Sequence, residues 1–132
     1  MVEFMSFKRL RSSFHAAFWG LRYCWRQEQN FRLQAGAAAA VLILGSLLRV
    51  GRQDFLWLLA LSALVLILEL ANTAVEKLID VVKPRLTVQA GIVKDVMAGA
   101  VLVAAVGSAL VAAIIFLPRV VELAGEWWYT RP

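Results

Sequence analysis

The chain has 132 residues, of which 61% are apolar and only 17% are charged, with 14 basic against 9 acidic side chains. This composition excludes an ordinary soluble domain, in which apolar residues make up roughly 45–50%, and it indicates an integral membrane protein. The basic surplus suits an anionic membrane surface better than nucleic acid, so no nucleic-acid partner is expected. With Cys24 as the only cysteine, no internal disulfide can form.

The first segment, residues 4–29, has the pattern of an amphipathic helix. Basic and polar side chains separate apolar ones that recur every three or four residues, namely Phe4, Phe7, Leu10, Phe14, Phe18, Leu21 and Trp25. A helix with a basic polar face of this kind lies in the membrane interface. The alternative, a surface helix packed on a soluble core, is disfavoured because no such core is visible elsewhere. Charges interrupt the early apolar residues, so no cleavable leader is expected.

Three apolar segments follow, and we expect spans at residues 32–49, 54–80 and 94–117. A span needs about 20 residues. The first is short and relies on the long side chains of Arg32 and Arg49 reaching the interfaces. The second is long enough only if it continues past Glu69. Pro118 is expected to close the third. The fold class is therefore an all-α membrane protein, with one domain over residues 1–132.

The distribution of basic residues predicts the orientation. Most of them lie in the N-terminal helix and in the region 77–94. Positively charged segments stay in the cytoplasm. We therefore expect a multi-pass protein with a cytoplasmic N-terminus.

The second span ends in a polar stripe. On a helix, Glu69, Asn72, Glu76 and Asp80 lie within about 80° of one another. Ionisable groups inside a membrane are costly unless paired, and they usually mark a functional path. Glu76 and Asp80 could simply be solvated at the interface, but Glu69 should lie deepest.

Three further residues are expected at the height of this stripe: Glu28 at the end of the surface helix, and Lys94 and Asp95 at the start of the third span. Carboxylates are ligands for a hard cation such as Mg²⁺. A metal ion and a lysine are the minimum for phosphoryl transfer, although no known nucleotide-binding loop motif is present. The residues alone leave open a metal–phosphate site, a cation-coupled transporter, and a non-enzymatic subunit that docks through small residues at Ala100, Ala104, Ser108 and Ala112.

The pattern E-x-x-N-x-A-x-E-x-x-x-D at 69–80, followed by Lys-Asp at 94–95 and Ala-Gly-Ala-Val at 98–101, resembles the prokaryotic diacylglycerol kinase family, which includes undecaprenol kinases. The resemblance extends over nearly the whole chain. It implies a homotrimer in the bacterial inner membrane, with one surface helix and three membrane helices per subunit. It also implies a composite active site between subunits, where ATP phosphorylates a membrane lipid.

The resemblance further implies a role for each matched position. Glu28 and Glu76 hold Mg²⁺ with the ATP phosphates, and Glu69 is the general base for the lipid hydroxyl. The nucleotide is bound by Asn72, Glu76, Lys94 and Asp95, with Lys94 on the phosphates.

Two further sets complete the implied site. A loop that differs from the family's usual sequence adds Arg85, Leu86 and Thr87 to the nucleotide contacts. The substrate-binding residues are Glu69 and Ala98 together with Arg9 and Trp19, which would lie near the lipid or the nucleotide. We expect diacylglycerol as the acceptor, with undecaprenol as the alternative and a cation-coupled transporter as a remote one.

Overall fold

The structure is a computed structural model that describes residues 7–82 and 88–129, with side-chain environments as far as Gly125. It contains four helices: α1 (Phe7–Gln27), α2 (Gln29–Leu47), α3 (Arg52–Val82) and α4 (Val88–Tyr129). The last three are long and apolar enough to cross a membrane. The expectation of an all-helical protein with three helices long and apolar enough to span a membrane is therefore confirmed.

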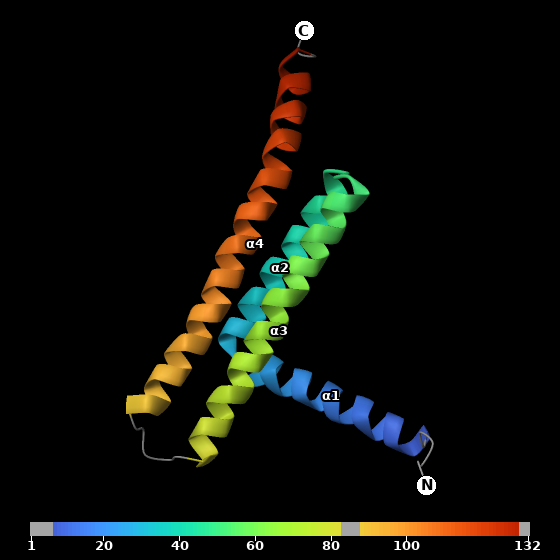
Figure 1. The fold of residues 1–132 in the computed structure, drawn as a ribbon. Coiled ribbons are helices and arrows are strands. Elements are labelled where there is room, and N and C mark those ends of the chain that lie inside the picture. Colours follow the sequence, from blue (N-terminus) through green and yellow to red (C-terminus); the bar gives the residue numbers. More distant parts are fainter. Residues whose placement is uncertain (1–6, 83–87, 130–132) are drawn as a thin grey trace.

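Helix α1 stands apart from the other three, which run alongside one another (Figure 1). A single residue in an extended conformation, Glu28, turns the chain from α1 into α2. The apolar side chains of α1 are exposed, for example Phe7 at 88%, Phe14 at 69% and Phe18 at 71%. A helix that lies on a membrane surface has such exposed apolar side chains to insert into the lipid. The surface location of α1 stays a prediction.

Helices α2 and α3 form a tight hairpin because a glycine lets them approach closely. A Cβ at Gly45 would lie 3.1 Å from Cδ1 of Leu58, which is itself only 2% exposed. Beyond this point α2 ends in a Schellman motif. Val50 N–H donates to the Gly45 carbonyl at 3.1 Å, and Arg49 N–H donates to the Ser46 carbonyl at 3.2 Å. Arg49 takes the left-handed position, with φ 50°.

Helix α4 is longer than expected, because Pro118 does not end it and the helix runs on to Tyr129. Proline removes one backbone donor and clashes with the carbonyl four residues earlier, but here the helix continues. The next residue, Arg119, ties α4 to the α2–α3 turn. Its Nε donates to the Leu48 carbonyl at 3.3 Å and its Nη2 to the Arg49 carbonyl at 3.4 Å. Those carbonyls follow the end of α2, where backbone acceptors need partners from elsewhere.

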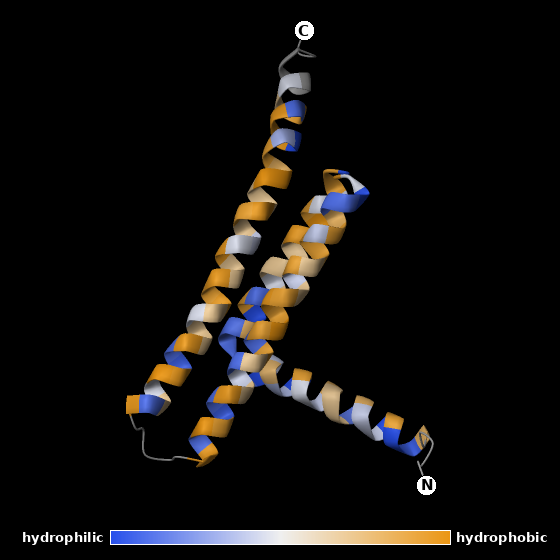
Figure 2. Ribbon diagram, viewed as in Figure 1, coloured by the Kyte–Doolittle hydropathy of each residue, from blue (hydrophilic) through white to orange (hydrophobic). Residues whose placement is uncertain are grey.

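The interior of the single chain is small, and most large apolar side chains of the spans face outward. Leu47 is 74% exposed, Leu110 61% and Ile114 72%. Apolar residues predominate along the three long helices, and polar ones gather near the ends (Figure 2). In a bilayer such outward faces contact lipid tails or another copy of the chain. Helix α1 leaves the bundle in the half of the molecule where α3 ends and α4 begins (Figure 1).

Candidate active site

The polar stripe of α3 runs from a buried end to an exposed end. Glu69 is 4% exposed, Asn72 8% and Thr73 5%, and these are the buried polar residues in the part of the chain that the structure describes. Glu76, one turn beyond Asn72, is half-buried. The side chain of Asp80, at the far end, is 54% exposed. The burial of Glu69 agrees with its expected depth, and the exposure of Asp80 agrees with its interfacial placement.

Asn72 holds one of these carboxylates in place and leaves an acceptor unused. Its Nδ2 donates to Glu76 Oε1 at 3.1 Å. Its Oδ1 is buried and has no hydrogen-bond partner within residues 7–82 and 88–125. An unsatisfied buried acceptor costs about 1–3 kcal/mol. This oxygen is therefore available to accept a hydrogen bond or to bind a cation.

Glu28 is brought to α3 by the extended link between α1 and α2. Lys77 Nζ lies 3.4 Å from Glu28 Oε1. Glu69 interacts electrostatically with both Glu76 and Glu28. Three carboxylates from two segments thus share one region, as expected, although the described residues contain no set of three or more His, Cys, Asp or Glu close enough together to bind a metal ion.

Lys77 is a site residue that the sequence analysis missed. It is next to Glu76 in the sequence, but it lies about 80° from Glu69 around the helix, off the stripe. Helical geometry alone gave no reason to single it out, because its role comes from the position of Glu28. The one signal in the sequence was the position of Lys77 directly after Glu76.

The contact between α1 and α3 beneath Glu28 is made by Cys24 and Thr73. Cys24 is 7% exposed, and its thiol is hydrogen-bonded to the Thr73 side chain. Burial, followed by the negative charge of Glu28, raises the pKa of the Cys24 thiol. This contact fixes the last turn of α1 and, with it, the height of Glu28 against α3.

Lys94 joins the exposed end of the stripe from α4. Its Nζ donates to Asp80 Oδ1 at 2.6 Å, and the Lys94 side chain is 26% exposed. The neighbouring Asp95 and Ala98, farther along α4, are exposed. The structure therefore brings Lys94 to α3 as predicted, with Asp80 as its partner.

The other predicted residues are more distant or lie outside the described part. Arg9 is in the first turn of α1, about 27 Å along the helix from its last residue. Trp19 stacks on Tyr23 in the middle of α1, with ring centroids 5.9 Å apart. Arg85, Leu86 and Thr87 fall outside the described residues.

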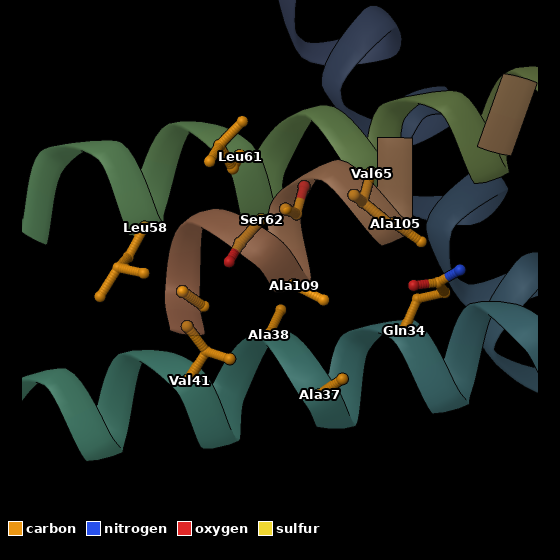
Figure 3. Close-up of a pocket in the computed structure, with 12 residues that line it drawn as sticks. Gln34, Ala37, Ala38, Val41, Leu58, Leu61, Ser62, Val65, Ala105 and Ala109 are labelled. Atoms are coloured by element: carbon orange, nitrogen blue, oxygen red, sulfur yellow. The ribbon is translucent and has the colours of Figure 1, made fainter. Parts of the chain in front are cut away.

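A cavity of about 120 Å³ lies deeper between α2, α3 and α4, within the spans. Figure 3 shows side chains of all three helices around it. Val65 lines it, one helical turn before Glu69. The rest of the lining is mostly small or apolar, with polar groups from Gln34, Ser62 and Ser108.

Comparison with known proteins identifies the family. The sequence profile described as prokaryotic diacylglycerol kinase matches residues 15–116, well over half of the chain. The chain belongs to the prokaryotic diacylglycerol kinase family. The matched range contains the polar stripe, the α1–α2 link and Lys94, and it leaves out Arg9.

Two relatives in this family are 38% identical to the chain. One is a diacylglycerol kinase of Synechocystis sp., matched over 112 residues that make up 84% of this chain and 64% of that protein. The other is an undecaprenol kinase of Bacillus subtilis, matched over 111 residues that make up 84% of this chain and 90% of that protein. The family resemblance seen in the sequence is therefore confirmed, and the family is one of lipid kinases.

Proposed function

We propose that this chain is a membrane lipid kinase that transfers the γ-phosphate of ATP to the hydroxyl group of a lipid. We favour diacylglycerol as the acceptor, giving phosphatidic acid, and keep undecaprenol as the second candidate. One observation carries the proposal: a buried carboxylate, Glu69, lies on the same helix stripe as Glu76 and close to Glu28. Membership in the family supports the same reaction.

Glu69 is the proposed general base. It takes the proton of the lipid hydroxyl, whose oxygen then attacks the γ-phosphorus of ATP. The bond from that phosphorus to the bridging oxygen breaks, and ADP leaves with the electron pair. Because Glu69 is only 4% exposed, little water can reach it, and desolvation makes a carboxylate a stronger base.

The spacing along α3 supplies proximity. Glu69 and Glu76 are seven residues apart, about 10 Å along the helix. A hydroxyl at the membrane surface and a phosphate in the cytosol can therefore meet on one face of one helix. Holding two reactants in this way is among the largest contributions available to an enzyme. The cavity that ends at Val65 is placed to take the part of the lipid chain nearest its headgroup.

Mg²⁺ fits the oxygen donors of this site. Glu28 and Glu76 would hold it, and the unpartnered Oδ1 of Asn72 is an oxygen of the type that a hard cation prefers. The ion, when bound, neutralises charge on the phosphates. Glu28 would exchange its contact with Lys77 for the ion, and Lys94 would leave Asp80 to reach the phosphates.

The remaining parts of the proposal concern assembly and location. We propose a homotrimer in the bacterial inner membrane, with the N-terminus and the α3–α4 connection in the cytoplasm. The exposed apolar faces of the three long helices and the small interior of one chain support association. The lipid and nucleotide contacts would be completed by Asp95, Ala98, Trp19, Arg9 and the segment 85–87. Of these, Arg9 would reach the site from the distant end of α1.

The transporter alternative is not favoured. It would account for Glu69, but it gives no reason for Glu28, Lys77 and Lys94 to gather at the same end of α3.

The test is a direct comparison of the two lipids. Purified protein in mixed micelles receives labelled ATP with Mg²⁺ and either diacylglycerol or undecaprenol. We expect label in one or both lipids, and a loss of roughly 100-fold or more in the variant Glu76→Gln. Asp54→Asn is the matched control, since Asp54 is an acidic residue in the first turn of α3, at its other end. The proposal is wrong if neither lipid gains label, or if Glu76→Gln and Asp54→Asn behave alike.

A further inference from the structure

The ammonium of Lys77 contacts a carboxylate that the proposed site needs for its metal ion. Lys77 Nζ lies 3.4 Å from Glu28 Oε1, and the two side chains are 47% and 23% exposed. Among the ion pairs of residues 7–82 and 88–125, this is the one that joins α3 to the link between α1 and α2. Glu28 is also the proposed partner of Glu76 in holding Mg²⁺. The lysine and the metal ion therefore have a ligand in common.

The contact compensates a local excess of negative charge. Glu69 interacts electrostatically with both Glu76 and Glu28, and it is buried. Carboxylates that share a partly buried region disfavour one another's charged form unless a cation lies close to them. In the part of the chain that the structure describes, the cation in contact with Glu28 is Lys77. This side chain therefore does in the metal-free protein what a divalent cation does in the loaded one.

The contact can open without any unpacking of the helices. Lysine has a flexible four-carbon stem and a strongly hydrated ammonium, and the half-exposed side chain of Lys77 can turn into water. Glu28, in contrast, is held at its height by the buried contact between Cys24 and Thr73. A partly exposed ion pair is weak, and a divalent cation attracts a carboxylate more strongly than an ammonium does. The ion can therefore displace the lysine while Glu28 stays in place.

We propose that Lys77 competes with the metal ion for Glu28. Its ammonium neutralises Glu28 before a divalent cation binds, and it moves into solvent when the cation arrives. This inference rests on the proposed function, because it takes Glu28 as a metal ligand. Lys77 then has no part in the transfer of the phosphate. It sets the concentration of free Mg²⁺ at which the enzyme is half-saturated.

A second role open to an ammonium at this position is contact with a phosphate of ATP. The printed geometry favours competition, since the partner of Lys77 is a carboxylate of the proposed metal site. The two roles predict different results for loss of the charge. Removing a competitor tightens the binding of a divalent cation, whereas removing a phosphate ligand raises the KM for ATP.

The first measurement is the binding of Mn²⁺ to the full chain in nonionic micelles, without nucleotide or lipid, followed by electron paramagnetic resonance. Lys77→Met keeps most of the apolar stem and removes the charge, and it should lower the dissociation constant for Mn²⁺ by about three- to tenfold. Lys77→Arg keeps the charge and should stay near wild type. The gain in Lys77→Met should shrink at about 0.5 M salt, because salt screens exposed charges.

The second measurement is lipid phosphorylation as a function of free Mg²⁺ at saturating ATP. In Lys77→Met the half-saturating concentration of Mg²⁺ should fall by the same factor as the dissociation constant for Mn²⁺. The KM for ATP and kcat should each change by less than about twofold, because the residue does not take part in the transfer step.

Two controls show whether the effect passes through Glu28. Lys8→Met removes an equal charge from an exposed position near the far end of α1 and should leave Mn²⁺ binding unchanged. Glu28→Gln removes the shared ligand and should weaken Mn²⁺ binding. In that background, adding Lys77→Met should change the dissociation constant by less than about twofold, because residues that act through one contact are not additive.

Competition is refuted if Lys77→Met binds Mn²⁺ no more tightly than wild type, or if the gain is equal in Lys8→Met or persists in the Glu28→Gln background. A raised KM for ATP in place of tighter Mn²⁺ binding would also refute it and make Lys77 a phosphate ligand. An active wild type whose Mg²⁺ dependence is unaltered in Lys77→Met overturns this inference alone. Tighter Mn²⁺ binding in Lys77→Met, with no lipid phosphorylated by the wild type, overturns the kinase proposal and leaves the competition standing.

Discussion

Replacing Asn72 with leucine should lower the activity of this protein and leave its free energy of unfolding nearly unchanged. Asn72 makes one hydrogen bond through Nδ2, to Glu76 at 3.1 Å, and keeps Oδ1 buried without a partner. Leucine has nearly the same shape and neither group. The substitution therefore removes the cost of the unpaired Oδ1 and the benefit of the Nδ2 hydrogen bond at the same time.

The two effects can be weighed. A hydrogen bond to a charged group contributes about 1.5–3 kcal/mol, and a buried unsatisfied acceptor costs about 1–3 kcal/mol. Glu76 is only half-buried, so water replaces part of the lost bond. The net change in the free energy of unfolding should therefore be within about 1 kcal/mol of zero. In the proposed site Asn72 orients Glu76 through this hydrogen bond, so we expect kcat/KM to fall by about 10- to 100-fold.

The measurements are unfolding in mixed micelles and lipid phosphorylation under the same conditions. Thr73→Val is the matched control, because Thr73 is the next residue, is equally buried, and makes its hydrogen bond to Cys24 rather than to a carboxylate. The reasoning is refuted if Asn72→Leu retains more than half of the wild-type activity. A loss of more than about 3 kcal/mol of stability would also refute it, since Oδ1 would then have a structural partner.

Other changes test other contacts. Lys94→Met should lower kcat/KM by about tenfold or more, because we propose that the ammonium contacts the phosphates. It should barely move the unfolding midpoint, because the ion pair of Lys94 with Asp80 is exposed. A large fall in the unfolding midpoint together with the loss of activity would contradict this. Arg119→Ala should lower the free energy of unfolding by about 1 kcal/mol, measured by denaturation in micelles, because two carbonyls at the α2–α3 turn lose their donor. Arg49→Gly should raise it by about 1 kcal/mol, because glycine accepts φ 50° without strain, and Arg49→Ala should give no such gain. The raised pKa of the buried Cys24 thiol means that less thiolate is present at neutral pH, so maleimide should label Cys24 slowly, with a rate that keeps rising above the pH at which an exposed thiol levels off. In Glu28→Gln the labelling rate should rise at lower pH than in the wild type. An unchanged pH dependence of the labelling rate would show that the Glu28 charge does not act on the thiol.

The sequence alone was enough to predict the membrane class, the three long helices and the polar face of α3. These features follow from local patterns: apolar runs of sufficient length, and polar residues at helical spacing from Glu69 to Asp80. The same local reasoning was wrong at Pro118. A proline weakens a helix at one point, but it does not decide whether the surrounding residues continue it.

The tertiary structure decided which charged groups meet. The pairing of Lys77 with Glu28, and of Lys94 with Asp80, joins residues far apart in the chain or on different helices, and no periodicity within one helix contains that information. The unused oxygen of Asn72 and the stacked rings on α1 likewise depend on side-chain positions. Spacing along the sequence therefore determined which face of each helix is polar, whereas the packing of the helices determined what each polar group contacts, because electrostatic and hydrogen-bond interactions act only over short distances in space.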